Sequence, residues 1–226
     1  MNEEYRRKRK PAYAGIYNCC IKRLMDIFFS GAALLFLWPI YLIIGIAIVI
    51  ETGFPVFYRA ERGGYKGKTF KICKFRSMVK NADKIGGGTT ALNDSRITKV
   101  GYVLRKTKLD EIPQLGQVFT GKMSFVGPRP ELLKYVEKYE GEEKLILQVR
   151  PGITDYSSVE FINLDEIVGG ENADEMYEKY VLKKKNMLRV KYAKTVSFKT
   201  DIDILIKTLL SVWRKIIEFV VKKEHR

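Results

Sequence analysis

Residues 27–50 read IFFSGAALLFLWPIYLIIGIAIVI, an uncharged apolar run of 24 residues with Pro39 near its centre. About 20 apolar residues in one straight helix are enough to cross a bilayer. Pro39, however, has no N–H to donate, and its ring clashes with the carbonyl four residues earlier. We therefore expect two half-helices of about 12 residues, each roughly 18 Å long, and neither reaches across about 30 Å of hydrocarbon.

Basic residues flank the run on both sides. They are Arg6, Arg7, Lys8, Arg9, Lys10, Lys22 and Arg23 before it and Arg59, Arg62, Lys66, Lys68 and Lys71 after it. Because Lys and Arg prefer the cytoplasmic side, both ends are expected on one face, as in a re-entrant hairpin within one leaflet. A single span kinked at Pro39 is the alternative that this segment leaves open. A signal peptide is disfavoured, because no small-residue cleavage site follows the run.

The rest of the chain predicts one compact domain of mixed α/β class, mostly helical. Short strands at 54–59 and 69–75 around the glycine-rich turn 62–68 predict a β-hairpin. Helical spacing predicts helices over 97–108, 111–119, 131–148 and 173–194. We divide the chain into a basic N-terminal segment (1–21), a re-entrant helix–break–helix (22–51), a cytosolic domain (52–200) and an amphipathic surface helix with a basic tail (201–226).

The last segment has helical spacing between residues 201 and 221. Its apolar positions include Ile202, Leu205, Leu209 and Trp213, set against Lys207, Arg214 and Lys215. A basic amphipathic helix with one Trp can lie in the headgroup plane with its apolar face in lipid. Packing of the same face on the domain core is the alternative, and beside a membrane hairpin we favour the interfacial position.

Composition limits the partners without choosing among them. A formal net charge of +15 and a pI near 9.6 suit nucleic acid, anionic lipid or a phosphorylated substrate alike. Cys19, Cys20 and Cys73 show no metal-type spacing with His225, so neither a disulfide framework nor a zinc site is indicated. A reducing, cytosol-facing domain fits best.

Residues 108–115, KLDEIPQL, place Asp110 and Glu111 side by side before a helix. Adjacent carboxylates are costly to keep ionised unless a cation lies between them, so the pair is a candidate site for Mg²⁺ and a phosphate. One carboxylate of such a pair can act as a nucleophile at phosphorus. The alternative is structural: Asp110 caps the helix and Glu111 complements its dipole.

Residues 125–131, FVGPRPE, hold Arg129 between Pro128 and Pro130. Fixed φ angles on both sides reduce the entropy lost when the guanidinium binds a phosphate or carboxylate. Further basic candidates are Lys74, Arg76, Arg105 and Arg150. A simple turn and a solvated positive face explain these features equally well when each is taken alone.

The order of these motifs is more specific than any one of them. The motifs are KRLMD (22–26) before the proline-interrupted run, FKICKFRSM (70–78), LDEIPQL (109–115), MSFVGPRP (123–130) and VRPGIT (149–154). In this arrangement the chain resembles the bacterial sugar transferases known as monotopic phosphoglycosyl transferases, in their minimal form. The resemblance runs from about Lys22 to the C-terminal helix.

The resemblance implies a reaction and a location. Such enzymes move a phosphosugar from a UDP-sugar to a polyprenol phosphate such as undecaprenyl phosphate, release UMP and begin a lipid-linked glycan. They lie on the bacterial inner membrane with the catalytic domain facing the cytoplasm. The expected partners are therefore the two substrates and an anionic bilayer, with no nucleic acid; a homo-oligomer is left open.

The resemblance also implies residue roles. Asp110 would be the nucleophile that forms a covalent phosphosugar, and with Glu111 it would hold Mg²⁺. Lys74, Arg76, Arg105, Arg129 and Arg150, with Pro128 and Pro130 framing the loop, would bind the substrate phosphates. Lys22, Arg23, Asp26, Trp38 and Pro39 would anchor the hairpin in the membrane.

One segment departs from the family pattern. Many relatives continue after Thr154 with a Gly-Leu-Ala-Gln type of sequence, whereas residues 155–163 here read DYSSVEFIN. We therefore carry over no residue role from the family to this segment. The competing function is a membrane-tethered basic module that binds nucleic acid or anionic lipid, which accounts for the charge but not for the ordered LDE and GPRP motifs.

Overall fold

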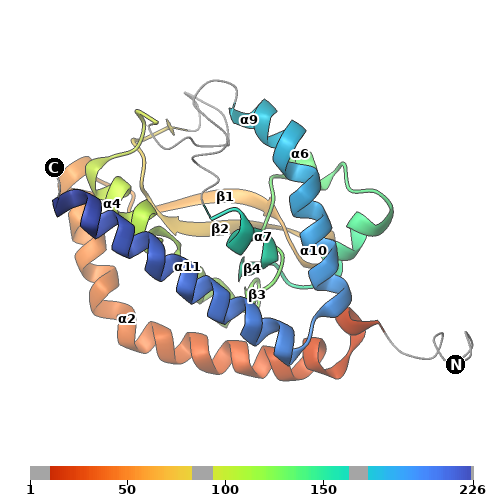
Figure 1. Ribbon diagram of the computed structural model, residues 1–226. Helices are drawn as coiled ribbons and strands as arrows, with labels where there is room; N and C mark the ends of the chain where they lie inside the picture. Colours follow the sequence, from red (N-terminus) through yellow and green to blue (C-terminus); the bar gives the residue numbers. More distant parts are fainter. Residues whose placement is uncertain (1–10, 83–93, 163–172, 225–226) are drawn as a thin grey trace, which may run out of the picture.

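The computed structural model describes residues 11–82, 94–162 and 173–224, so the basic flank at residues 6–10 lies outside it. Within these ranges the chain is mostly helical with two small sheets, which confirms the predicted class (Figure 1). The helices are α2 (Lys22–Thr52), α4 (Lys99–Thr107), α5 (Gln114–Phe119), α6 (Leu133–Val136), α7 (Tyr156–Glu160), α9 (Ala173–Met176), α10 (Lys183–Thr195) and α11 (Phe198–Glu224). The strands are β1 (Phe57–Gly63), β2 (Thr69–Phe75), β3 (Ser124–Val126) and β4 (Gly152–Thr154). Shorter or wider helical turns are η1 (Ala12–Ala14), η2 (Tyr17–Ile21), η3 (Tyr65–Gly67), η4 (Leu109–Glu111), η5 (Gly141–Gln148) and η6 (Tyr177–Leu182).

Helix α2 carries the apolar run and continues through Pro39 for 31 residues. The predicted break into two separate half-helices is therefore not observed. Figure 1 shows instead that α2 changes direction along its length, as expected where a proline removes one helical hydrogen bond. Gly53, with φ 71°, ends the helix in the left-handed region that favours glycine.

The protein covers only the inner side of α2. Ile44 and Ile48 join a buried cluster with Phe75 of β2 and Leu104 of α4. The opposite side exposes large apolar side chains, including Leu35, Phe36, Trp38, Ile43 and Ile50. Among the described residues, Tyr17–Thr52 is the one helical stretch long and apolar enough to cross a membrane, with a mean hydropathy of 2.7.

The predicted hairpin is confirmed. Strands β1 and β2 pair antiparallel with Phe57 opposite Phe75 and Gly63 opposite Thr69. Of the predicted helices, 97–108 corresponds to α4, 111–119 to η4 and α5, and 173–194 to the succession α9, η6 and α10. A continuous helix over 131–148 is wrong: the chain forms α6 and then η5, which begins at Gly141 with φ 51°.

Helix α11 crosses the molecule between the two arms of α2 (Figure 1). Near its start Asp201 accepts hydrogen bonds from Tyr17 and Tyr192, at 2.7 and 2.8 Å, and pairs with the Lys22 ammonium. Further along, α11 packs on α4, as α2 also does. Leu209 and Trp213 are 69% and 64% exposed, so the protein leaves this part of the apolar face open. The C-terminal helix is confirmed, and its interfacial position stays a prediction.

Candidate active site

The Asp110–Glu111 pair lies in a tight turn between two helices. Lys108 ends α4 with φ 60°, the chain passes through η4, and Pro113 with φ −60° opens α5. Helix α5 packs against α2, where the Arg23 guanidinium donates to the carbonyls that end α5 at Val118 and Phe119. The acidic turn is therefore fixed directly to the apolar helix.

Two cations from distant parts of the chain hold Glu111. Lys74 Nζ of β2 donates to Glu111 Oε1 at 2.8 Å. Arg129 donates to both carboxylate oxygens, with Nη1 2.9 Å from Oε2 and Nη2 on Oε1. Burial alone would raise the pKa of Glu111, but Arg129 and Lys74 hold that pKa well below its ordinary value. Glu111 is thus an ionised, fixed carboxylate.

Asp110 has less charge compensation than its neighbour. It is 7% exposed, and within the described part of the chain its only ion-pair partner is Lys74 Nζ, at 4.0 Å from Oδ2. Burial raises the pKa of Asp110, Lys74 opposes that shift, and the Glu111 charge adds to it. Burial also lowers the pKa of Lys74, although Glu111 opposes this. Two adjacent acids in unequal environments are typical of a site with divided roles.

Close packing of two backbones fixes the loop that carries Arg129. Gly127 N–H donates to the Thr154 carbonyl at 2.9 Å, and Gly152 N–H donates to the Pro128 carbonyl at 3.0 Å. A Cβ on Gly127 would lie 2.2 Å from the Arg150 carbonyl oxygen, and one on Gly152 would lie 2.1 Å from Gly127 N. Glycine is therefore required at both positions, and the loop follows the edge of the β3–β4 pair.

The remaining predicted phosphate-binding residues are dispersed. Arg76 follows β2 and donates to Thr52 Oγ1 and the Gly53 carbonyl, so it lies at the end of α2 and not beside the acids. Arg150 donates to the Gly121 carbonyl at 3.2 Å and lies over the Tyr65 ring. Arg105 acts on the Asp110 carboxyl only through its charge, which lowers the pKa. The structure thus brings together Asp110, Glu111, Lys74 and Arg129.

The predicted membrane anchors divide into two groups. Lys22 and Asp26 are buried and bind the protein: Lys22 pairs with Asp201, and Asp26 Oδ1 accepts the Phe125 N–H at 3.2 Å. Trp38 is 62% exposed on the outer side of α2, beside Pro39. A headgroup role for Lys22, Arg23 and Asp26 stays a prediction, because the contacts they make here are within the protein.

The two acids fit a magnesium ion that is shared with a substrate. Among the described residues there is no cluster of three or more His, Cys, Asp or Glu that could hold a metal. Mg²⁺ usually needs fewer, because it binds one or two carboxylates together with substrate phosphates. Burial raises the pKa of Asp110, and a divalent ion beside it would favour the ionised carboxylate.

Two buried side chains were missed from the sequence. Asp155 accepts the Arg129 N–H at 3.2 Å, and Arg189 of α10 lies between Asp155 and Glu131. The Asp-x-x-Ser spacing of residues 155–158 is a helix-cap signal that could have placed Asp155, since its side chain does cap α7. Nothing in the basic sequence of α10 separates Arg189 from the lysines around it.

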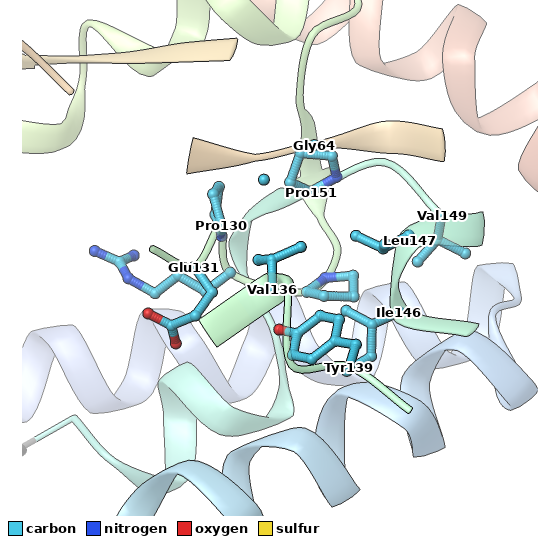
Figure 2. A pocket seen from close by; sticks show the side chains of 12 residues that line it. Gly64, Pro130, Glu131, Val136, Tyr139, Ile146, Leu147, Val149 and Pro151 are labelled. Carbon is cyan, nitrogen blue, oxygen red and sulfur yellow. The ribbon is translucent and has the colours of Figure 1, made fainter. Parts of the chain in front are cut away.

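A small cavity lies behind the Arg129 loop. Val136, Tyr139, Ile146 and Leu147 line it with mostly apolar surface (Figure 2). Its volume of about 20 Å³ has room for a water molecule and not for a nucleotide or sugar. A substrate must therefore approach the acids from elsewhere.

The fold and the site together define a class of protein in which a buried acidic centre is fixed against a long apolar helix. The chain belongs to the bacterial sugar transferase family, whose family model matches residues 17–215. The family expected from the motifs is thereby confirmed.

Several named relatives are similar to part of this chain. The UDP-glucose:undecaprenyl-phosphate glucose-1-phosphate transferase of Klebsiella pneumoniae is 42% identical over 147 residues, 63% of this chain and 31% of the relative. The UDP-N-acetylgalactosamine-undecaprenyl-phosphate N-acetylgalactosaminephosphotransferase of Aeromonas hydrophila is 37% identical over 142 residues, 62% of this chain and 34% of the relative. The exopolysaccharide production protein ExoY of Rhizobium meliloti (strain 1021) is 38% identical over 148 residues, 59% of this chain and 66% of the relative. The chain thus spans about a third of the two named transferases.

Proposed function

We propose that this chain transfers a sugar phosphate from a UDP-sugar to undecaprenyl phosphate and releases UMP. One observation carries the proposal. Asp110 and Glu111 lie buried together, and Glu111 is held by Lys74 and Arg129, which are 37 and 18 residues away in sequence. By their names, two relatives use different donors, UDP-glucose and UDP-N-acetylgalactosamine, and share undecaprenyl phosphate as the acceptor. We therefore propose the acceptor for this chain and leave the sugar of the donor open.

The chemistry proposed for Asp110 proceeds in two displacements. An Asp110 carboxylate oxygen attacks the sugar-bearing phosphorus, the bond from that phosphorus to the bridging oxygen breaks, and UMP leaves with that oxygen. A phosphate oxygen of the polyprenol phosphate then attacks the same phosphorus. The acyl phosphate bond breaks, Asp110 is restored as a carboxylate, and a polyprenyl diphosphate sugar is formed.

The unequal environments of the two acids support this division of labour. Glu111 is already bound by Arg129 and Lys74, whereas Asp110 is buried with little charge compensation and so gains most from a reaction that neutralises it. Asp110 and Glu111 are the residues that would hold Mg²⁺, which when bound would neutralise charge on the diphosphate. Lys74 and Arg129 then keep Glu111 ionised and in place.

We further propose that α2 is re-entrant and that the protein is monotopic on the cytoplasmic face of the bacterial inner membrane. In support, α2 changes direction along its length, and α11 runs across the angle between its two arms (Figure 1). Both helices expose large apolar side chains, such as Phe36 on α2 and Trp213 on α11. An acidic centre fixed to α2 would lie near the headgroup level, where the phosphate of the acceptor is found.

The test is UMP release by the detergent-solubilised full chain with Mg²⁺, undecaprenyl phosphate and a panel of UDP-sugars. Release from one donor is expected, with a loss of at least about 10³-fold in Asp110→Asn, because the nucleophile is removed. A donor labelled in the sugar, supplied without acceptor, should label the wild-type protein and not Asp110→Asn. Chasing with the acceptor should remove the label.

The controls separate the competing outcomes. Lys194→Ala breaks a surface ion pair with Glu142 and should leave turnover unchanged. If folded wild-type protein binds anionic vesicles or nucleic acid yet releases no UMP from any donor, a binding module replaces the transferase. If UMP is released but no label is trapped and Asp110→Asn stays active, the covalent route through Asp110 is wrong.

A further inference from the structure

The backbone N–H of Arg129 is held by a buried side chain. Pro128 and Pro130 fix φ on either side and have no N–H, so Arg129 carries the single amide hydrogen of this tripeptide. That N–H donates to Asp155 Oδ2 at 3.2 Å. Asp155 is 0% exposed, and its other oxygen, Oδ1, accepts the Ser158 N–H at 2.6 Å at the start of α7.

Glu131, which follows Pro130, is held by side chains from η6 and α10. Glu131 Oε2 accepts Arg189 Nη2 at 3.0 Å and the Tyr177 hydroxyl at 2.5 Å. Figure 2 shows the Glu131 carboxylate turned away from Ile146 and Leu147, the apolar residues that line the cavity. Arg189 keeps the Glu131 carboxyl ionised, with a pKa below its ordinary value despite burial.

Arg189 joins the two attachments. Its side chain is 1% exposed, and its Nε lies 4.0 Å from Asp155 Oδ2 while Nη2 binds Glu131. One guanidinium from α10 thus pairs both with Asp155, which accepts the Arg129 N–H, and with Glu131, two residues after Arg129. A buried charge pair with one member removed is strongly destabilised, so these three charges fix one arrangement of the loop.

We propose that Asp155 and Arg189 are positioning residues that direct the Arg129 guanidinium onto Glu111, and so set the geometry of the acidic pair. The inference rests on the proposed transferase function. Asp155 opens the segment that departs from the family pattern. Neither residue contacts Asp110 or Glu111, and both act through Arg129.

The first experiment measures the loop directly. Asp155→Asn keeps the volume but leaves one acceptor oxygen for two N–H donors, those of Arg129 and Ser158. In hydrogen-exchange mass spectrometry of the full chain, peptides spanning residues 127–131 should exchange at least about tenfold faster. Ser158→Ala is the matched control: it removes a hydroxyl bonded to Oδ1 at 2.7 Å and leaves Oδ2 in place. Unchanged exchange of the Arg129 amide in Asp155→Asn would overturn the proposal.

The second experiment asks whether the effect passes through Arg129. Asp155→Asn should lower kcat by about 10- to 100-fold and change the donor KM little. The reason is that displacing the Arg129 guanidinium should slow the chemical step more than it weakens binding of the donor. In an Arg129→Lys background the same substitution should cost less than about threefold. Equal losses in both backgrounds would mean a merely structural role and would contradict the proposal.

Two further outcomes are decisive. If Asp155→Asn does not fold, Glu131→Gln is measured in its place. This substitution keeps an oxygen that can accept from Tyr177 but removes the charge that Arg189 balances. Its loss of kcat is likewise expected to be smaller in the Arg129→Lys background than in the wild-type background. If the wild-type chain releases no UMP, the transferase proposal fails, while the exchange experiment still decides whether Asp155 holds the Arg129 backbone.

Discussion

Asp110 and Glu111 should have opposite effects on stability when they are neutralised. The folded-state pKa of Asp110 is raised, so its stabilising contribution exists at acid pH and is lost as the pH rises through that pKa. Without Mg²⁺, Asp110→Asn should therefore raise the unfolding midpoint at pH 7.5 by about 2–4 °C, the change that 1 kcal/mol produces in a domain of this size. The gain should shrink as the pH falls toward the ordinary range of an Asp carboxyl.

Glu111→Gln is the matched control for this prediction. The folded-state pKa of Glu111 is lowered, so its contribution to the free energy of unfolding is present above the ordinary Glu pKa. That contribution is lost only as the pH falls through the lowered pKa. The substitution should lower the midpoint at pH 7.5, because it leaves Arg129 and Lys74 without their anion. Thermal unfolding followed by circular dichroism between pH 5 and 8 measures both variants, and shifts of the same sign would contradict the assignment.

Two glycines offer a second test at this scale. Gly127→Ala should destabilise the protein by about 1–3 kcal/mol and lower activity, because its Cβ would meet the Arg150 carbonyl oxygen at 2.2 Å. Gly116→Ala in α5 meets nothing within 4 Å and should be neutral or stabilising by up to about 1 kcal/mol. Comparable unfolding midpoints for the two variants would show that the β3–β4 approach is less close than described.

The sequence could identify the reacting groups more readily than their partners. Adjacent acids and an arginine between prolines are local patterns, so Asp110, Glu111 and Arg129 could be predicted. Arg76 could not be placed, because β2 ends at Phe75 and the chain then turns to the end of α2. The contacts of Asp155 with Arg129 and of Arg189 with Glu131 join residues 26 and 58 positions apart, and such long-range contacts leave no local signature.

Two tryptophans can measure the depth of α2 and α11 in lipid, since the chain has only Trp38 and Trp213. In Trp38→Phe, Trp213 fluorescence should be quenched more by lipids brominated near the headgroup than by deeply brominated ones, as expected for an interfacial helix. In Trp213→Phe, Trp38 should show the reverse order. Strong quenching of Trp213 by aqueous iodide, with none by brominated lipid, would instead place α11 outside the membrane.

Helices and strands with a clear hydrophobic pattern in the sequence were predictable. Segments whose conformation depends on one or two specific contacts were not. The apolar run and the alternating strands of the hairpin led directly to α2, β1 and β2. The predicted helix over 131–148 failed because Glu131 is held to Arg189 and Gly141 takes φ 51°, and together these interrupt a pattern that is helical in spacing alone. Pro39 does not end α2, and proline is tolerated within helices in membranes, where one lost hydrogen bond can be compensated.

For the molecule as a whole, the re-entrant path predicts that residues before and after α2 lie on the same side of the membrane. Cys19 and Cys20 are exposed just before α2, and Lys68→Cys adds a reporter in the hairpin beyond it. In intact spheroplasts neither should react with a membrane-impermeant maleimide, and both should react after lysis. The background is set by Cys19→Ser/Cys20→Ser, which retains Cys73. Labelling of one reporter in intact spheroplasts would establish a single span.

The ion pair between Lys22 and Asp201 joins residues 179 positions apart. At a synthesis rate of about 5–20 residues per second, Lys22 is added to the chain roughly 10–40 s before Asp201. Once α2 has emerged from the ribosome, and until Asp201 has been made, the charge at the start of this apolar helix has no Asp201 to neutralise it. On the proposed re-entrant path, insertion of α2 into the membrane can therefore precede the contact that fastens it to α11, which forms only when α11 has been made.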